Sequence, residues 1–328
     1  GTIPADGAWS IFIGGGTPTL PGPDWLARLL ALVRKVAYGP ATREWSIESL
    51  PGYITPEVAR ILKSAGVDRV TLGMQSMDPG VLESIGRADQ LPLFWKAVDI
   101  LRSAGIESIG VDLILGLPGE RLANFRPGLE ALLAAKIPHI SAYMLSIEEG
   151  TPWGRENIPV SDWMQRRLFT ILARRLRTGG YEQYEVSNYA LPGFPCKHNQ
   201  GTWEGRELLG FGLAAVGTVS RPGGARVRRQ NTVDLEAYLA NPGGGHTEEW
   251  LTACDQYHET LMLGLRSRSG LPEDCGFAVE TGFSPEELCK RLEKYETQGF
   301  LRRQAGRWRT TIKGRLWLDS MLVELFQG

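Results

Sequence analysis

Apolar and amphipathic segments alternate along the first 190 residues of the chain. Short apolar runs, among them Trp9–Ile13, Arg69–Met74 and Ile106–Leu115, predict strands. Between them, apolar residues recur at helical spacing, as in the segment from Trp25 to Val36. Such an alternation predicts a parallel sheet, either open or closed into a barrel.

Several residues predict where these elements begin and end. Asp24 is expected to cap the first helix, and Gly66 is expected to end a helix that opens at Thr55-Pro56. Further along, two strands at His139–Leu145 and Glu182–Ser187 are expected on either side of a long helix.

The pattern changes after residue 190. Residues 191–248 are dense in Gly and Pro, and few regular helices are expected there. Residues 249–328 return to helical spacing and end in an expected strand, Arg307–Thr311, and an expected helix, Lys313–Phe326. The sequence therefore predicts three parts: an α/β barrel domain (1–190), a connecting region (191–248) and a small α+β winged-helix-like domain (249–328).

Charge and hydropathy narrow the class of protein. The 328 residues carry 36 basic and 37 acidic side chains, a net charge of −1, which gives no electrostatic reason to expect nucleic-acid binding. No apolar run approaches the roughly 20 residues of a membrane helix, and no signal-peptide pattern opens the chain. We therefore expect a cytoplasmic protein with no nucleic-acid partner.

The cysteines are scattered and lack the spacing of a cluster or zinc motif. They are Cys196, Cys254, Cys275 and Cys289. A disulfide framework is not expected in a chain of this size, so each cysteine is expected to be a reduced, partly buried thiol.

A glycine-rich loop, Gly14-Gly15-Gly16-Thr17-Pro18, follows the first expected strand. No Lys follows it, so it is not a phosphate loop of the G-x-x-x-x-G-K type. Consecutive glycines let a ligand approach the backbone closely, but they also suit a simple tight turn. By itself the loop leaves both interpretations open.

Polar residues occur where other strands end, which is where ligands bind in parallel α/β domains. Glu48 ends the second strand, Gln75 follows the third, and Arg87 lies in the next loop. Each of these alone would also suit an exposed surface position. Asp112 interrupts an apolar strand, where an unpaired charge would be costly, so it requires a partner, a ligand or a bend.

The chain resembles the coproporphyrinogen-oxidase-like radical-SAM family in the order of five features. These are the Gly-Gly-Gly-Thr-Pro loop, the strand-end Glu48, Leu72–Ser76, Gly86-Arg87 and Asp112–Gly119. The resemblance covers nearly the whole chain.

Two branches of that family are candidates, the oxygen-independent coproporphyrinogen III dehydrogenases and the HemW-type haem chaperones. Segments similar to the chaperone's patterns are Ser141–Tyr143, Glu149–Pro152, Tyr184–Ala190, Cys196–Asn199 with Trp203, and Thr311–Arg315. The resemblance therefore favours the chaperone branch. Three positions depart from the family patterns, with Leu50 for Asn, Thr202 for Tyr, and a His lost near Thr218.

The resemblance implies an incomplete (β/α)6 barrel that binds S-adenosylmethionine. The backbone of Gly15, Gly16 and Thr17 would hold the methionine amino group. The side chains that would line the methionine and ribose part of the site are Glu48, Gln75, Arg87, Asp112 and, as a weaker addition, Ser146.

The family also binds a [4Fe–4S] cluster through a C-x-x-x-C-x-x-C loop after its first barrel strand. No cysteine precedes Cys196 in this chain. We therefore expect that first strand and the cluster loop to lie upstream of residue 1. Residues 1–328 would not by themselves cleave S-adenosylmethionine reductively.

Cys196 and His198 could offer a thiolate and an imidazole to haem iron. The alternative is that Cys196 is packed and His198 is held by a hydrogen bond. The sequence leaves both open.

Three functions follow from the sequence. The first is a haem chaperone that binds haem and S-adenosylmethionine and delivers haem to haem proteins such as respiratory-chain cytochromes. Such a chaperone could also form a homodimer. The second is the coproporphyrinogen dehydrogenase. The third is a degenerate barrel that acts as an interaction scaffold.

Overall fold

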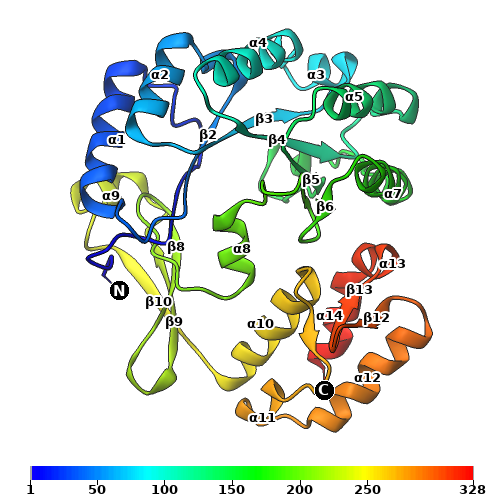
Figure 1. The fold of residues 1–328 in the computed structure, drawn as a ribbon. Helices are drawn as coiled ribbons and strands as arrows, with labels where there is room; N and C mark the ends of the chain where they lie inside the picture. The colour runs from blue at the N-terminus through cyan, green and yellow to red at the C-terminus, as the bar shows by residue number, and fades with distance from the viewer. Residues whose placement is uncertain (1, 328) are drawn as a thin grey trace. The chain divides into compact units, whose positions relative to one another are not determined.

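The computed structural model describes residues 2–327, which fold as two compact units. The first comprises residues 4–198, and the second comprises residues 199–327 with residues 2 and 3. The first unit therefore continues beyond residue 190, to the end of the segment that carries Cys196 and His198. Figure 1 shows the course of the chain through both units.

A seven-stranded sheet forms the centre of the first unit. Its five parallel strands are neighbours in chain order: β1 (Ser10–Ile13), β2 (Glu44–Ser49), β3 (Arg69–Gln75), β4 (Ser108–Leu115) and β5 (His139–Met144). Two antiparallel strands, β7 (Asn188–Ala190) and β6 (Glu182–Gln183), continue it beyond β5. The expected α/β fold with a parallel sheet is confirmed.

The expected single strand at Glu182–Ser187 is wrong, because the chain turns between β6 and β7. The carboxylate of Glu185 accepts hydrogen bonds from the amide of Ser187 (2.7 Å) and from the side-chain amide of Asn188 (2.5 Å). These bonds tighten the backbone into a bend, and β7 then pairs antiparallel with both β5 and β6.

Helices cover one face of this curved sheet (Figure 1). They are α1 (Pro23–Ala37), α2 (Pro56–Ala65), α3 (Pro79–Ser84), α4 (Gln90–Ser103), α5 (Leu122–Ala134) and α7 (Asp162–Thr178). The short α6 (Pro152–Arg155), which has no buried residue, precedes α7. In β2, Trp45 and Ile47 are fully buried, and Trp45 contacts Tyr38 at the end of α1. Because side chains alternate along a strand, Glu44, Ser46 and Glu48 point to the opposite, interior face.

The helix ends follow local chemistry. Gly66 ends α2 with a φ of 94°, as predicted, and Thr55 caps its start by accepting from the amide of Val58. The prediction that Asp24 caps α1 is wrong, because α1 already begins at Pro23. Proline suits the first helical position, since its φ is preset and it has no N–H to satisfy. Asp24 instead lies in the first turn of the helix.

The second unit begins with an antiparallel sheet that the sequence pattern did not predict. Its order is β10-β9-β8, and its strands are β8 (Val216–Ser220), β9 (Arg226–Asn231) and β10 (His246–Leu251), with α9 (Leu235–Ala240) between the last two. Charged residues dominate β9, so it lacks apolar alternation. Cross-strand ion pairs support it instead, such as Arg228 Nη1 with Glu249 Oε2 at 2.7 Å.

The last part of the second unit combines helices with a small sheet of order β11-β13-β12. Its elements are α10 (Ala253–Arg266), β11 (Leu271–Pro272), α11 (Phe277–Glu280), α12 (Pro285–Thr297), β12 (Leu301–Gln304), β13 (Arg307–Thr310), α13 (Ile312–Leu316) and α14 (Leu318–Phe326). The final helix is interrupted at Trp317, whose backbone (φ −120°, ψ 12°) is not helical. Across residues 2–327, no helix is long and apolar enough to span a membrane.

Candidate functional site

The glycine loop and Glu48 meet at the carboxyl edge of the parallel sheet. The loop follows β1, and the amide of Gly15 donates to Glu48 Oε2 at 3.1 Å. This bond ties the first loop to the second strand. In parallel α/β folds, this edge is the one that binds ligands.

The three glycines of the loop serve different purposes. A Cβ on Gly14 would lie 2.6 Å from the ring of Phe12 and 2.8 Å from Glu48 Oε2, so glycine is required there for packing. Gly15 and Gly16 have φ values of 81° and 59°, and nothing lies within 4 Å of their Cβ positions. Their backbone is therefore exposed and open to a ligand. Thr17 is half-buried, and its carbonyl accepts from the amide of Leu20 in a turn.

Two carboxylates face the interior next to this loop. Burial raises the pKa of Glu48, although the Gly15 amide partly offsets the effect. Burial also raises the pKa of Asp112, to about 6. The negative charge of Glu48 contributes to this rise, whereas a hydrogen bond from Ser141 opposes it. Within residues 2–327, neither carboxylate forms an ion pair. Two neighbouring acids without a cation favour a ligand that is cationic or rich in hydroxyl groups.

Gln75 ends β3 in a strained conformation. Its φ is 67°, which is unusual for a residue other than glycine, and the register of β3 with β4 shifts between Gly73 and Gln75. Its side-chain amide lies over Gly73, and Gln75 Oε1 is buried with no hydrogen-bond partner. Arg87 lies nearby, with Nη1 3.5 Å from the carbonyl of Gly73. A strained backbone beside an unpartnered acceptor is typical of a ligand site.

Ser146 follows β5 on an exposed segment, and no described hydrogen bond joins it to Glu48, Gln75 or Asp112. Sequence reasoning missed Ser141, which is buried and bonds Asp112. Ser141 is in register with Asp112 across β4 and β5, so alternation along the expected strand could have placed it on the same face.

Glu120 is a second missed residue at this edge, and it closes the loop after β4. Its Oε2 accepts from the amide of Gly116 at 2.7 Å, and the side chain is buried. Burial raises the pKa of Glu120 to about 7; the Gly116 amide opposes this rise, and the charge of Asp78 adds to it.

Cys196 and His198 lie elsewhere, at the amino edge of the same sheet. Glu44, the first residue of β2, accepts at Oε1 from the Cys196 thiol (3.2 Å) and from the amides of Lys197 (2.9 Å) and His198 (3.3 Å). Its Oε2 accepts from Arg69 Nε at 2.9 Å. Burial would raise the pKa of Glu44, but Arg69, Cys196 and His198 together lower it.

Ring stacking, a hydrogen bond and packing also hold the Cys196–His198 segment in place. His198 stacks on Phe12 with ring centroids 4.7 Å apart, and its Nδ1 lies 3.2 Å from the hydroxyl of Ser10. Cys196 is 3% exposed and packs with Tyr184. Iron ligation by either residue would require release of these contacts. Their assignment as haem ligands stays a prediction.

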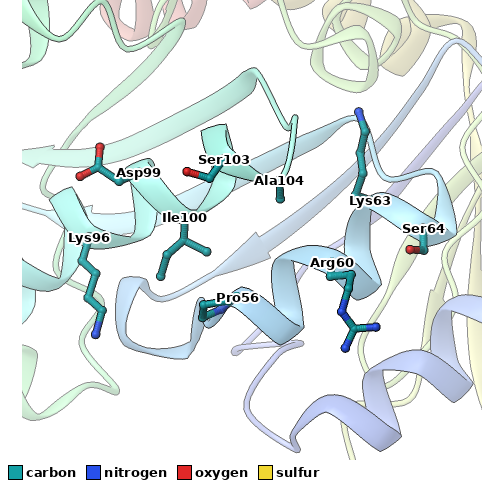
Figure 2. Close-up of a pocket in the computed structure, with 9 residues that line it drawn as sticks. All are labelled: Pro56, Arg60, Lys63, Ser64, Lys96, Asp99, Ile100, Ser103 and Ala104. Carbon is teal, nitrogen blue, oxygen red and sulfur yellow. The ribbon is translucent and has the colours of Figure 1, made fainter.

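A groove of about 760 Å³ lies between α2 and α4 (Figure 2). Its lining comes from α2 and from the second half of α4, with Arg60 and Lys63 on one side and Lys96 and Asp99 on the other. No residue predicted for the ligand site lines it. It belongs to the outer helical layer and is separate from the carboxyl edge.

We expect Glu120→Gln to change how stability depends on pH. The pKa of Glu120 is about 7 in the folded chain and 4.5 in an ordinary carboxyl group. The folded state of the wild type is therefore stabilised by the bound proton at low pH, and this stabilisation is lost as pH rises from 4.5 through 7. The loss is at most about 3 kcal/mol. Gln stays neutral and can still accept from Gly116, so urea unfolding at pH 5 and pH 8 should show a smaller decline for the variant. Parallel pH profiles would contradict this account.

We also expect Glu44→Gln to destabilise the first unit by about 3 kcal/mol, because it leaves Arg69 buried without its counter-charge. The matched control is Glu57→Gln, which breaks an exposed 3.9 Å pair with Arg60 and should cost less than about 1 kcal/mol. Urea unfolding measures both changes. Equal, small losses would show that the buried pair is not structurally important.

Comparison with known proteins identifies the family to which this fold belongs. Residues 3–131 match the Radical SAM superfamily, and residues 251–317 match the HemN C-terminal domain. The haem chaperone HemW of Lactococcus lactis is 34% identical over 273 residues, which cover 80% of this chain and 70% of that protein. HemW of Haemophilus influenzae is 31% identical, with 97% of this chain and 82% of that protein covered.

Among solved structures, the coproporphyrinogen III oxidase HemN of Escherichia coli superposes with a TM-score of 0.79 at 21% identity. The match covers 97% of this chain and 77% of that protein, and it establishes the fold. The expected radical-SAM barrel with a following small domain is thereby confirmed. On these sequence relationships, the chain belongs to the HemW family within the radical SAM superfamily.

Proposed function

We propose that this chain is a haem chaperone that binds S-adenosylmethionine at the carboxyl edge of its sheet. It would deliver haem to haem proteins such as respiratory-chain cytochromes. The observation that carries the cofactor site is the bond from the Gly15 amide to Glu48 beside Asp112. The chaperone role is supported by the likeness to HemW proteins over most of the chain.

The residues at this edge fit S-adenosylmethionine in charge and in hydrogen-bonding groups. When bound, this molecule supplies a sulfonium centre, together with an ammonium group, a carboxylate and ribose hydroxyls. The open backbone of Gly15 and Gly16 can approach the methionine amino group. Thr17 would add its backbone beside them, although its carbonyl already accepts from the amide of Leu20. Glu48 and Asp112 supply negative charge that no described ion pair compensates.

The remaining residues suit the neutral and anionic parts of the ligand. Gln75 Oε1 is a buried acceptor that a hydroxyl or amine would satisfy. The guanidinium of Arg87 can pair with a carboxylate in fork geometry. Ser146 is exposed two residues after β5 and would add at most a peripheral hydrogen bond.

The iron–sulfur cluster of the superfamily is a different case. In residues 2–327, no group of three or more His, Cys, Asp or Glu side chains could hold a metal ion. None of these residues is therefore proposed as a cluster ligand.

A first experiment tests the cofactor site by calorimetric titration with S-adenosylmethionine. We expect Gly16→Val to weaken binding about tenfold or more, because a side chain would occupy the open space above the loop. The matched control is Gly180→Val, since Gly180 also has a positive φ (87°) and nothing within 4 Å of its Cβ position. Equal affinities for the two variants would argue against the site.

The same titration should depend on pH. Protonation of Asp112 removes a negative charge, so affinity for the cationic ligand should fall as pH drops through about 6. Asp112→Asn should bind more weakly at pH 8 and should lose most of this dependence. An unchanged pH profile in the variant would exclude Asp112 from the site.

A second experiment separates the chaperone from the dehydrogenase. We expect the chain to bind haemin and to release it to apomyoglobin, which a coproporphyrinogen dehydrogenase would not do; the Soret absorption follows both steps. Cys196→Ser and His198→Ala report on the iron ligand, because loss of a ligand shifts the Soret maximum. Wild-type spectra in both variants would place the ligand elsewhere. Failure to bind haemin or S-adenosylmethionine would favour an interaction scaffold.

A further inference from the structure

Two cysteines of the second unit lie in direct contact. Cys275 follows β11 in a turn, and Cys289 lies in α12. Their sulfur atoms are 3.0 Å apart, and both are free thiols. A disulfide bond is about 2.05 Å long, so a further approach of about 1 Å would join them. We propose that Cys275 and Cys289 are a modification site, a thiol pair that a low-molecular-weight disulfide oxidises to an intrachain disulfide.

Loss of the two S–H donors leaves the surrounding hydrogen bonds satisfied. The carbonyl of Glu273 accepts from the thiols of Cys289 (3.4 Å) and Cys275 (3.8 Å), and also from Trp308 Nε1 (3.3 Å). Oxidation removes the two weak S–H donors, but Trp308 still satisfies the carbonyl. No buried acceptor is left without a partner, so the oxidised pair carries no such penalty.

The backbone around the pair is suited to a small movement. Cys275 has a φ of 53°, a conformation that costs energy for a residue other than glycine. It lies in a short turn between β11 and α11, whereas Cys289 is held within α12. Closing the bond therefore requires adjustment of the turn rather than of a helix.

Accessibility sets the order of the chemistry. Cys275 is fully buried and Cys289 is half-buried, so an incoming disulfide reaches Cys289 first. The Cys289 thiolate attacks one sulfur of that disulfide and releases one small thiolate. The Cys275 thiolate then attacks the Cys289 sulfur and releases the second. The two small thiolates take up the two protons lost by the cysteines, and the small disulfide is reduced as the cysteines are oxidised.

The burial of Cys275 also predicts how the second step responds to pH. Burial and the neighbouring Cys289 raise the pKa of the Cys275 thiol. Little thiolate is therefore present near neutral pH, and closure of the bond should accelerate as pH rises.

The bond would restrain a segment that covers α10. Phe283 stacks on Tyr257 of α10 with ring centroids 3.9 Å apart, and Phe277 lies 6.1 Å from the same ring. Both phenylalanines belong to the loop that a 275–289 disulfide would close. Closing this loop restricts the unfolded chain and should stabilise this part of the second unit.

The test treats the full chain with oxidised glutathione under native conditions, followed by alkylation and peptide mass mapping. We expect a peptide cross-linked between Cys275 and Cys289, faster formation at pH 8.5 than at pH 7, and a rise of several degrees in the melting midpoint. Cys289→Ser should abolish both the cross-link and the thermal shift.

Two further readouts make the result decisive. Cys275→Ser should leave Cys289 as a stable mixed disulfide with glutathione, because the resolving thiol is gone. Cys254→Ser, which removes an exposed cysteine, should leave the cross-link unchanged. If Cys275 and Cys289 of the wild-type chain are both still alkylated when Cys254 is already glutathionylated, the proposal is wrong.

Discussion

Side chains alternate between the two faces of each strand in the parallel sheet, and this alternation determines which face each charged residue of the strands occupies. Trp45 and Ile47 of β2 face the helices and are fully buried, whereas Glu44 and Glu48 of the same strand face the interior. Because the neighbouring strands are parallel and in register, their interior residues fall on the same face. The interior face of the sheet therefore carries polar residues, and the face that packs on the helices carries apolar residues.

The two carboxylates of β2 show how position along one strand changes chemistry. Glu44, at the amino end, is paired with Arg69 and accepts hydrogen bonds from the Cys196–His198 segment, and its pKa is lowered. Glu48, toward the carboxyl end, has the Gly15 amide but no cation, and its pKa is raised. A counter-charge stabilises the charged form of a buried acid, whereas burial without one favours the neutral form.

The same contrast explains why the Cys196–His198 segment is ordered. A buried carboxylate is costly unless its oxygens are satisfied. Glu44 meets this demand with Arg69, Ser46, the Cys196 thiol and two backbone amides. The segment therefore closes the amino edge of the sheet, and its residues are constrained by this carboxylate before any ligand is considered.

The sequence by itself determined the alternation of strands and helices, the carboxyl-end positions of Gly15, Glu48 and Gln75, the charged position of Asp112 within its strand, and the family. These depend on local periodicity and on motif order, both of which a single chain displays. Only the tertiary structure decided the turn at Glu185, the charged strand β9, and the pairing of Glu44 with Cys196 across a separation of 152 residues. It also brought Cys275 and Cys289 together, although their spacing matches no motif. Each of these depends on a partner distant in the chain or on a hydrogen bond that competes with regular structure, and neither leaves a periodic signal in the sequence.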